Sequence, residues 1–180
     1  MAKKKKRYPK LPNKLIVIEN PDKLWHESWT KNRNMLNIPH PFRALMMGPP
    51  NNGKSMVIKN IIVRAKPQFE EIFVIHADPN FTKEYDDLDV TMLDEIPPLE
   101  EWQGLVKTLV IIDDIDLTQL NKEQKKNLNR LFGNVSTHKN ISVMLTSQDP
   151  FSVPPSVRRM SNLFILWKSK DLDSLSQIAR

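Results

Sequence analysis

The chain has no cysteine and only four glycines among its 180 residues. Without cysteine, disulfide bonds and thiolate metal sites are excluded. No apolar run approaches the roughly 18 residues that a membrane-spanning helix requires, and the N-terminus lacks the apolar stretch of a secretory signal. The four histidines, at positions 26, 40, 76 and 138, do not have the spacing of a metal site. With 39% hydrophobic and 27% charged residues, the composition is typical of one globular domain with a buried core.

The excess positive charge lies at the N-terminus. The formal net charge is +6, and the first ten residues, MAKKKKRYPK, carry six basic side chains. The other 21 basic residues balance the 21 acidic ones. We therefore expect residues 1–12 to be a disordered basic tail. The tail could contact DNA, act as a nuclear import signal or aid solubility. Its residues available for a DNA contact are Lys3, Lys4, Lys5, Lys6 and Arg7.

Two of the scarce glycines bracket the octet GPPNNGKS at residues 48–55. Its spacing, G-x-x-x-x-G-K-S, is that of a phosphate-binding loop. Glycine lets backbone N–H groups turn toward an anion, the lysine reaches the β- and γ-phosphates, and the serine hydroxyl ligates Mg²⁺. An apolar run precedes the octet and a helical pattern follows it, as such a loop requires. The residues predicted to bind ATP and Mg²⁺ here are Gly48, Pro49, Pro50, Asn51, Asn52, Gly53, Lys54 and Ser55.

Short apolar runs alternate with helical patterns along the chain. Strands are expected at 44–47, 71–78, 90–93, 108–116, 141–148 and 162–168, and helices at 56–63, within 97–105, and at 117–133 with Gly133 as its stop. This alternation predicts an α/β fold, a three-layer P-loop NTPase with a mostly parallel central sheet. The ATPase core is expected to span residues 43–180. Residues 13–42 are expected to pack on it, with Trp25 and Trp29 on one helical face.

In the segment TLVIIDDID, four apolar residues are followed directly by two acids, Asp113 and Asp114. At the end of a strand beside the loop, Asp113 is placed to bind Mg²⁺. Asp114 faces another way and could act as general base on an attacking water. The alternative is that the acids cap the N-terminus of a helix.

Gln148 ends the apolar strand ISVMLTSQ, at the edge where ligands of parallel sheets bind. A polar side chain there can contact the γ-phosphate and position water. The segment TSQDP could instead be an ordinary turn. We therefore expect Asp114, Gln148 and Lys54 to be the catalytic residues.

Hydrolysis at such loops is often slow until a basic side chain arrives from a neighbouring subunit. The candidates are Arg158, Arg159, Arg130 and Lys139. The arginine pair precedes the last predicted strand, where it could face another subunit or simply be solvated. Lys122 and Lys126 share a helical face with Arg130, which is typical of solvent coverage and also possible for a DNA track.

Five motifs occur in a fixed order over about residues 43–168: ALMMGPPNNGKS, EIFVIHADPNFTKEYDDL, LVIIDDID, HKNISVMLTSQ and PPSVRRMSNLFIL. Together they resemble those of the genome-packaging ATPases of double-stranded DNA viruses, the poxvirus-type branch of the FtsK/HerA superfamily. The resemblance implies an ASCE (RecA-like) sheet in which the Gln148 strand lies between the loop strand and the Asp113 strand.

The resemblance also implies a function and partners. The implied function is that of a motor that uses ATP and Mg²⁺ to pump double-stranded DNA into a capsid. The implied assembly is a homo-oligomeric ring of five or six subunits, which binds the capsid or its portal vertex. The expected location is the host cytoplasm or nucleus at the site of virion assembly, or the virion itself.

Two positions depart from this family. Its members commonly carry Arg-His where this chain has Thr137-His138. If that arginine acts in trans, its role has moved to Lys139, Arg130 or Arg158, or is unfilled. Asp114 also stands where many motor ATPases have glutamate.

The main alternative is a viral superfamily 3 helicase or another DNA-translocating ATPase. In those helicases, the strand that corresponds to residues 141–148 usually ends in asparagine. Their phosphate-binding loop and the acidic motif that binds the metal also tend to lie closer together in the sequence. A nucleotide kinase would need an arginine-rich lid, which the sequence lacks. A non-catalytic nucleotide-binding scaffold is disfavoured because Lys54 and both acids are present.

Overall fold

A computed structural model describes residues 38–80 and 83–168. They contain one six-stranded sheet, all of whose pairings are parallel, in the order β3-β2-β4-β5-β1-β6. The strands are β1 (Arg43–Met47), β2 (Glu71–His76), β3 (Thr91–Leu93), β4 (Thr108–Asp113), β5 (Ile141–Ser147) and β6 (Leu163–Leu166). The predicted α/β fold of a P-loop NTPase is therefore confirmed. The basic tail, Trp25 and Trp29 lie outside the described residues.

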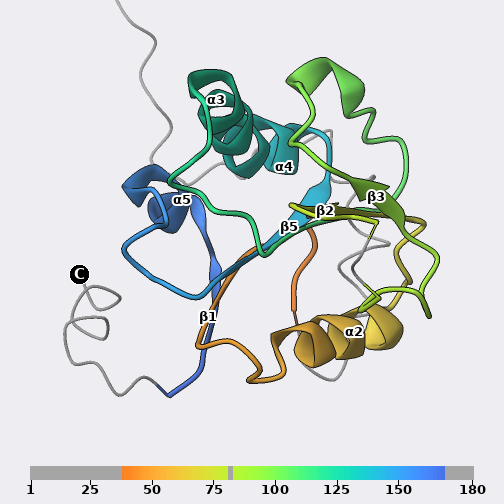
Figure 1. Ribbon diagram of the computed structural model, residues 1–180. Coiled ribbons are helices and arrows are strands. Elements are labelled where there is room, and N and C mark those ends of the chain that lie inside the picture. The colour runs from red at the N-terminus through yellow and green to blue at the C-terminus, as the bar shows by residue number, and fades with distance from the viewer. Residues whose placement is uncertain (1–37, 81–82, 169–180) are drawn as a thin grey trace, which may run out of the picture.

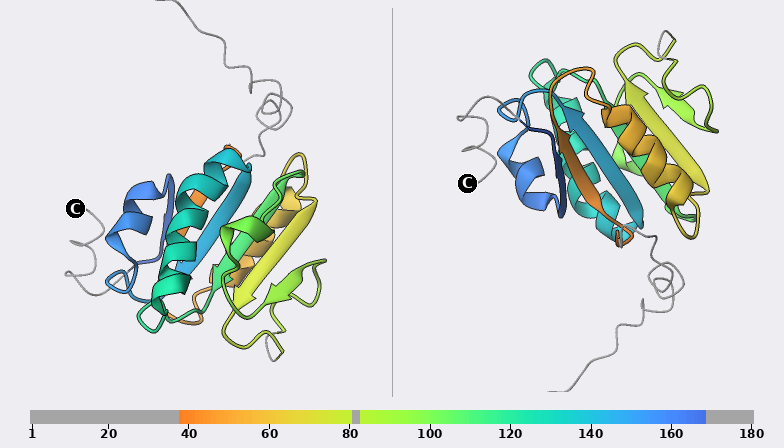
Figure 2. Two further views of the ribbon diagram at one scale, coloured as in Figure 1. Left: turned by 90° about the horizontal axis from the view of Figure 1, so that it is seen from above. Right: turned by 90° about the horizontal axis from the view of Figure 1, so that it is seen from below.

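Helices cover both faces of the sheet and give three layers (Figure 1, Figure 2). One face is covered by α2 (Lys54–Arg64), and the other by α3 (Lys122–Arg130), the π-helical turn η2 (Leu131–Val135), α4 (Ser136–His138) and α5 (Pro155–Met160). Each face has its own apolar core, built on Ile58 and Ile61 from α2 and on Leu128 and Phe132 from the opposite layer. Within residues 38–80 and 83–168, no helix has the length and apolarity of a membrane span.

Strand β5 lies between β1 and β4, as the family resemblance implied. Every residue of β4 and β5 is buried, which explains their continuous apolar runs. Because the strands are parallel, their carboxyl ends meet at one edge. The loop after β1, Asp113 at the end of β4 and Gln148 after β5 therefore share that edge, where ligands of such sheets bind.

Two predicted helices were wrong. Gly133 does not end a helix: it lies inside η2, and the helical path continues through α4. It lacks the positive φ of a C-terminal glycine cap, and the buried Leu131 and Phe132 continue the apolar stripe. The helix expected within 97–105 is a single 3₁₀ turn, η1 (Leu99–Glu101). Two prolines before it remove backbone donors, and Gly104 after it has a φ of 68°.

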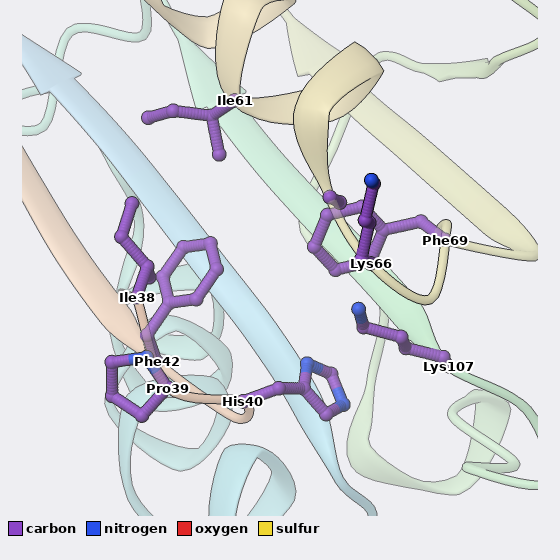
Figure 3. A pocket seen from close by; sticks show the side chains of 9 residues that line it. Ile38, Pro39, His40, Phe42, Ile61, Lys66, Phe69 and Lys107 are labelled. Atoms are coloured by element: carbon purple, nitrogen blue, oxygen red, sulfur yellow. The ribbon is translucent and has the colours of Figure 1, made fainter. Parts of the chain in front are cut away.

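Side chains that precede β1 and β4 and that follow α2 line a pocket at the opposite edge of the sheet (Figure 3). The pocket, lined in part by Phe42, Phe69 and Lys107, measures about 20 Å³, room for about one water. The Lys107 ammonium lies 4.6 Å from the centre of the Phe69 ring and donates to the carbonyl of Pro67. Burial lowers the pKa of Lys107. A nucleotide cannot fit in this pocket.

Candidate active site

The octet loop joins β1 to α2 at the carboxyl edge of the sheet. The Gly48 amide donates to the Ser147 carbonyl at 3.1 Å, which ties the start of the loop to β5. Asn51 and Gly53 have positive φ values of 58° and 78°, and these bends turn the chain into α2. A Cβ at position 48 would lie 2.7 Å from the β-carbon of Trp167. Packing therefore requires glycine at the first position of the loop.

Lys54 is the first residue of α2, and its side chain folds back over the loop. Its ammonium donates to the carbonyls of Gly48 at 2.9 Å and Pro49 at 2.7 Å. An ammonium has three protons, so one donor remains for an anion. The N-terminal end of α2, with its unpaired N–H groups and positive dipole, lies beside the same loop.

Asp113 is a buried carboxylate at the end of β4, with 6% of its surface exposed. One oxygen accepts from the Thr146 hydroxyl at 2.6 Å and the other from the Tyr85 hydroxyl at 2.6 Å. Both donors are neutral hydroxyls. Burial and the negative charge of Asp113 raise the pKa of Tyr85, which keeps the phenol protonated and able to donate.

Asp114 lies in different surroundings, as the sequence predicted. Its φ of 53° turns the backbone away from the strand, and its side chain is exposed. Its amide donates to the Thr146 hydroxyl at 3.3 Å. Its carboxylate accepts from the Gln148 side-chain amide at 3.1 Å. The acid and the glutamine, predicted from separate motifs, are therefore direct partners.

These groups line one cleft of about 680 Å³, within the size range of small-molecule sites. The lining includes residues 50–55, Asp113, Asp114 and Gln148. Gly48 and Pro49 lie at the start of the loop, outside this lining. The structure thus brings the predicted loop, acid pair and glutamine into one site.

Sequence reasoning gave no role in the site to three partners of these residues: Thr146, Glu84 and Tyr85. Thr146 could have been found, because it lies two residues before Gln148 and so on the same face of β5. Glu84 accepts the hydroxyl proton of Ser55 and lines the cleft. Glu84 and Tyr85 lie in a turn after β2, and no rule of residue spacing predicts that this turn lies against the phosphate-binding loop.

The four candidate trans-acting residues fall into two groups. The Arg158 guanidinium donates to the carbonyls of Pro150 and Val153 at 3.1 and 2.8 Å. The Lys139 ammonium donates to the carbonyls of Leu99 and Trp102. Both charges are thus held by their own chain. Arg159 is exposed and Arg130 half-buried, and neither side chain donates a hydrogen bond within the described part of the chain. Lys3 to Arg7, the candidate DNA contacts, lie outside that part.

Ser55 and Asp113 fit the requirements of Mg²⁺. The described residues contain no group of three or more His, Asp or Glu side chains that could hold a metal. Mg²⁺ does not need one, because it binds through one or two protein oxygens, substrate phosphates and water. Asp113 offers a buried carboxylate that accepts from the Thr146 and Tyr85 hydroxyls, and Ser55 offers a hydroxyl in the same cleft.

Comparisons with known proteins agree with this geometry. Residues 44–167 match the family described as ATPase family associated with various cellular activities (AAA). A comparison with curated proteins gives no match.

Solved structures of a viral protein share the fold. The genome packaging NTPase B204 from Sulfolobus turreted icosahedral virus 2, in complex with sulfate, has a TM-score of 0.61 at 20% identity over 79% of this chain and 81% of that chain. The same protein with ATP-gammaS has a TM-score of 0.57 at 17% identity, over 77% and 80%. B204, the DNA-packaging ATPase from Sulfolobus turreted icosahedral virus, gives 0.59 at 16%, over 78% and 82%. At these identities the likeness shows the fold.

Proposed function

The chain belongs to the AAA family of ATPases, and from this premise we propose that it is an ATP-hydrolysing motor that translocates double-stranded viral DNA into a capsid. The observation that carries the proposal is the cleft where the phosphate-binding loop meets Asp113, Asp114 and Gln148. A hydrolytic motor needs a phosphate cradle, a carboxylate near the attacking water and a polar group at the γ-phosphate. The cleft offers all three.

ATP binds with its phosphates over the loop. The loop amides and the positive end of α2 hold the phosphate charge. Lys54 leaves the carbonyls of Gly48 and Pro49 and donates to the β- and γ-phosphates. Ser55 and Asp113 would hold Mg²⁺, which would supply positive charge to neutralise the phosphates.

Asp114 and Gln148 act together on the γ-phosphate and the water. In the structure, the Gln148 amide donates to Asp114 at 3.1 Å. A γ-phosphate is a competing acceptor for that amide. When Gln148 turns to it, the Asp114 oxygen is released to accept a proton from the attacking water. Loss of the γ-phosphate after hydrolysis restores the pair, so Gln148 reports the nucleotide state to β5.

A basic residue of a neighbouring subunit completes the site in a homo-oligomeric ring of five or six subunits. Arg159 is the first candidate, because its guanidinium is exposed and donates no hydrogen bond within residues 38–80 and 83–168. Arg130 is the second. The carbonyl partners of Arg158 and Lys139 make those residues less able to reach across an interface.

Support for DNA packaging comes from the fold likeness to B204, a genome packaging NTPase, and from motifs that resemble the poxvirus-type branch of the FtsK/HerA superfamily. The proposed partners are duplex DNA and a capsid or its portal vertex, at the site of virion assembly. A superfamily 3 helicase is disfavoured, because Gln148 stands where those enzymes usually have asparagine.

The steady-state ATPase rate tests the proposal. It is measured for the protein alone, with duplex DNA and with single-stranded DNA, and for Lys54→Ala as the inactive control. We expect several-fold stimulation by duplex in preference to single-stranded DNA. Stimulation chiefly by single-stranded DNA would indicate the helicase, and absence of hydrolysis under every condition would contradict the ATPase itself.

A further inference from the structure

The turn at residues 83–88, which follows β2, contacts both residues assigned to Mg²⁺. Glu84 accepts the hydroxyl proton of Ser55. Tyr85, the next residue, donates to Asp113 at 2.6 Å. Two consecutive residues outside the phosphate-binding loop and the β4 acid pair therefore touch one metal ligand each.

Glu84 fixes the direction of the Ser55 hydroxyl. A serine hydroxyl has one proton and two lone pairs. With the proton held by Glu84, the lone pairs of Ser55 are free to face the cleft. A carboxylate acceptor also makes a ligating oxygen more basic. The Ser55 hydroxyl donates to Glu84, while Asp113 accepts from the Thr146 and Tyr85 hydroxyls.

Tyr85 fixes the carboxylate of Asp113 in the same way. The tyrosine is 2% exposed, and its ring packs in the apolar core between α2 and the sheet, so its hydroxyl has one position. Thr146 donates from the other side. Each Asp113 oxygen accepts one hydrogen bond and keeps a lone pair for a metal.

The turn is also attached to α2 at a second point. The Lys59 ammonium lies 2.6 Å from the carboxylate of Asp87. Lys59 is four residues after Ser55 and so lies on the same face of the helix. Contacts of Ser55 with Glu84 and of Lys59 with Asp87 run along that face and fix the register of the turn against α2.

We propose that Glu84 and Tyr85 are positioning residues for Mg²⁺, with Glu84 orienting the Ser55 hydroxyl and Tyr85 orienting the Asp113 carboxylate. This inference rests on the proposed ATPase function of the cleft. Since neither residue belongs to the loop that holds the phosphates, their loss weakens the binding of Mg²⁺ without weakening the binding of nucleotide in its absence.

The test is the Mg²⁺ dependence of nucleotide binding. Affinity for a fluorescent ATP analogue is measured in EDTA and then across a titration with MgCl₂, for wild type, Glu84→Ala, Glu84→Gln and Tyr85→Phe. We expect Glu84→Ala and Tyr85→Phe to raise the half-maximal Mg²⁺ concentration about 10-fold, in line with other residues that orient metal ligands. Glu84→Gln keeps an acceptor for Ser55, so its shift is smaller than that of Glu84→Ala.

The matched control is Asp86→Asn. It removes a negative charge from the same turn at an exposed residue that does not line the cleft, and it leaves the half-maximal concentration within about twofold of wild type. Equal shifts for Asp86→Asn and Glu84→Ala would overturn the inference, because net charge alone would explain both. Circular dichroism and Tm identify any variant that has lost the fold.

The remaining outcomes separate the inference from the proposed function. If the wild type binds nucleotide in an Mg²⁺-dependent way and Glu84→Ala and Tyr85→Phe match it, the inference is overturned and the proposed ATPase stands. If the wild type shows no Mg²⁺ dependence, the metal site fails and the inference fails with it.

Discussion

At the scale of single residues, the two acids after β4 owe their different properties to their surroundings. Asp113 is buried and accepts from two hydroxyls. Asp114 is exposed on a left-handed backbone and accepts from the Gln148 amide. A fixed, buried carboxylate suits a metal. An exposed carboxylate with one exchangeable partner suits proton transfer to and from water.

Asp114→Asn separates these roles. Asparagine tolerates a positive φ, so the backbone is retained, but its amide cannot accept a proton from water. We expect the affinity for ATP to stay within twofold of wild type while turnover falls about 100-fold or more. Nucleotide binding and single-turnover hydrolysis measure the two quantities.

The control for this change is Asp116→Asn, an exposed acid two residues later that does not line the cleft. It should leave turnover unchanged. Loss of ATP binding in Asp114→Asn, or turnover near the wild-type rate, would refute the role of Asp114 as the base.

The candidate site could be predicted only in part at this scale. The octet, Asp113, Asp114 and Gln148 were found because each follows an apolar run at the carboxyl end of a strand. Thr146 was overlooked although its place two residues before Gln148 puts it on the same face of β5, whereas Tyr85 lies 28 residues before Asp113 in a turn outside the strands. Such contacts depend on the order of strands in the sheet, which residue spacing does not encode.

At the scale of elements, the strands were predicted well and the helices less well. A strand buried on both faces has an apolar run that few other structures explain, and β4 and β5 follow this rule. Glycine was misread as a stop at Gly133, since a glycine can also occupy a helix interior at some cost. The apolar stripe beyond it was the better signal.

Gly133→Ala tests the helical path through η2. Alanine is favoured over glycine in a helix by about 0.5–1 kcal/mol. Its Cβ would lie 3.3 Å from the Met160 sulfur, and a methionine side chain can move by the small distance required. We therefore expect Tm to rise by roughly 2 °C, measured by thermal unfolding. A lower Tm would show that Met160 is held in place.

Asn121→Ala tests the start of α3. The Asn121 side chain accepts from the Gln124 amide at 2.8 Å, and the Gln124 side chain accepts from the Asn121 amide at 3.2 Å. Losing this reciprocal cap should lower the free energy of unfolding by about 1 kcal/mol, measured in urea. Asn134→Ala, at an exposed helical position, is the control and should change it by less than about 0.5 kcal/mol. Equal losses in the two variants would contradict the cap.

At the scale of the whole molecule, the parallel sheet separates two ends of different character. The carboxyl edge carries a cleft of about 680 Å³, and two pockets at the opposite edge are smaller, at about 20 and 160 Å³. The phosphate-binding loop, the two acids and Gln148 all lie at the carboxyl end of each subunit. In the proposed ring, a neighbour must present its basic residue to that end, so hydrolysis depends on assembly.

The net charge leads to a prediction about DNA. Outside residues 1–12, basic and acidic residues nearly balance. If the six basic side chains of the tail contact phosphates, the logarithm of the association constant for duplex DNA decreases as the logarithm of the salt concentration rises, with a slope of roughly −5. Deleting residues 1–12 should remove most of that slope and leave the DNA-free ATPase rate unchanged. Fluorescence anisotropy of a labelled duplex measures the slope, and an unchanged slope would exclude the tail as a DNA contact.

Displacement of a third strand from a DNA triplex tests the central claim most directly, because only a motor that moves along intact duplex strips the third strand without separating the other two. The account predicts displacement by the wild type with ATP and Mg²⁺, and none with Lys54→Ala or Asp114→Asn. If the wild type hydrolyses ATP in the presence of duplex DNA and leaves the triplex intact, or if it separates the duplex strands instead, the account of a double-stranded DNA translocase is contradicted.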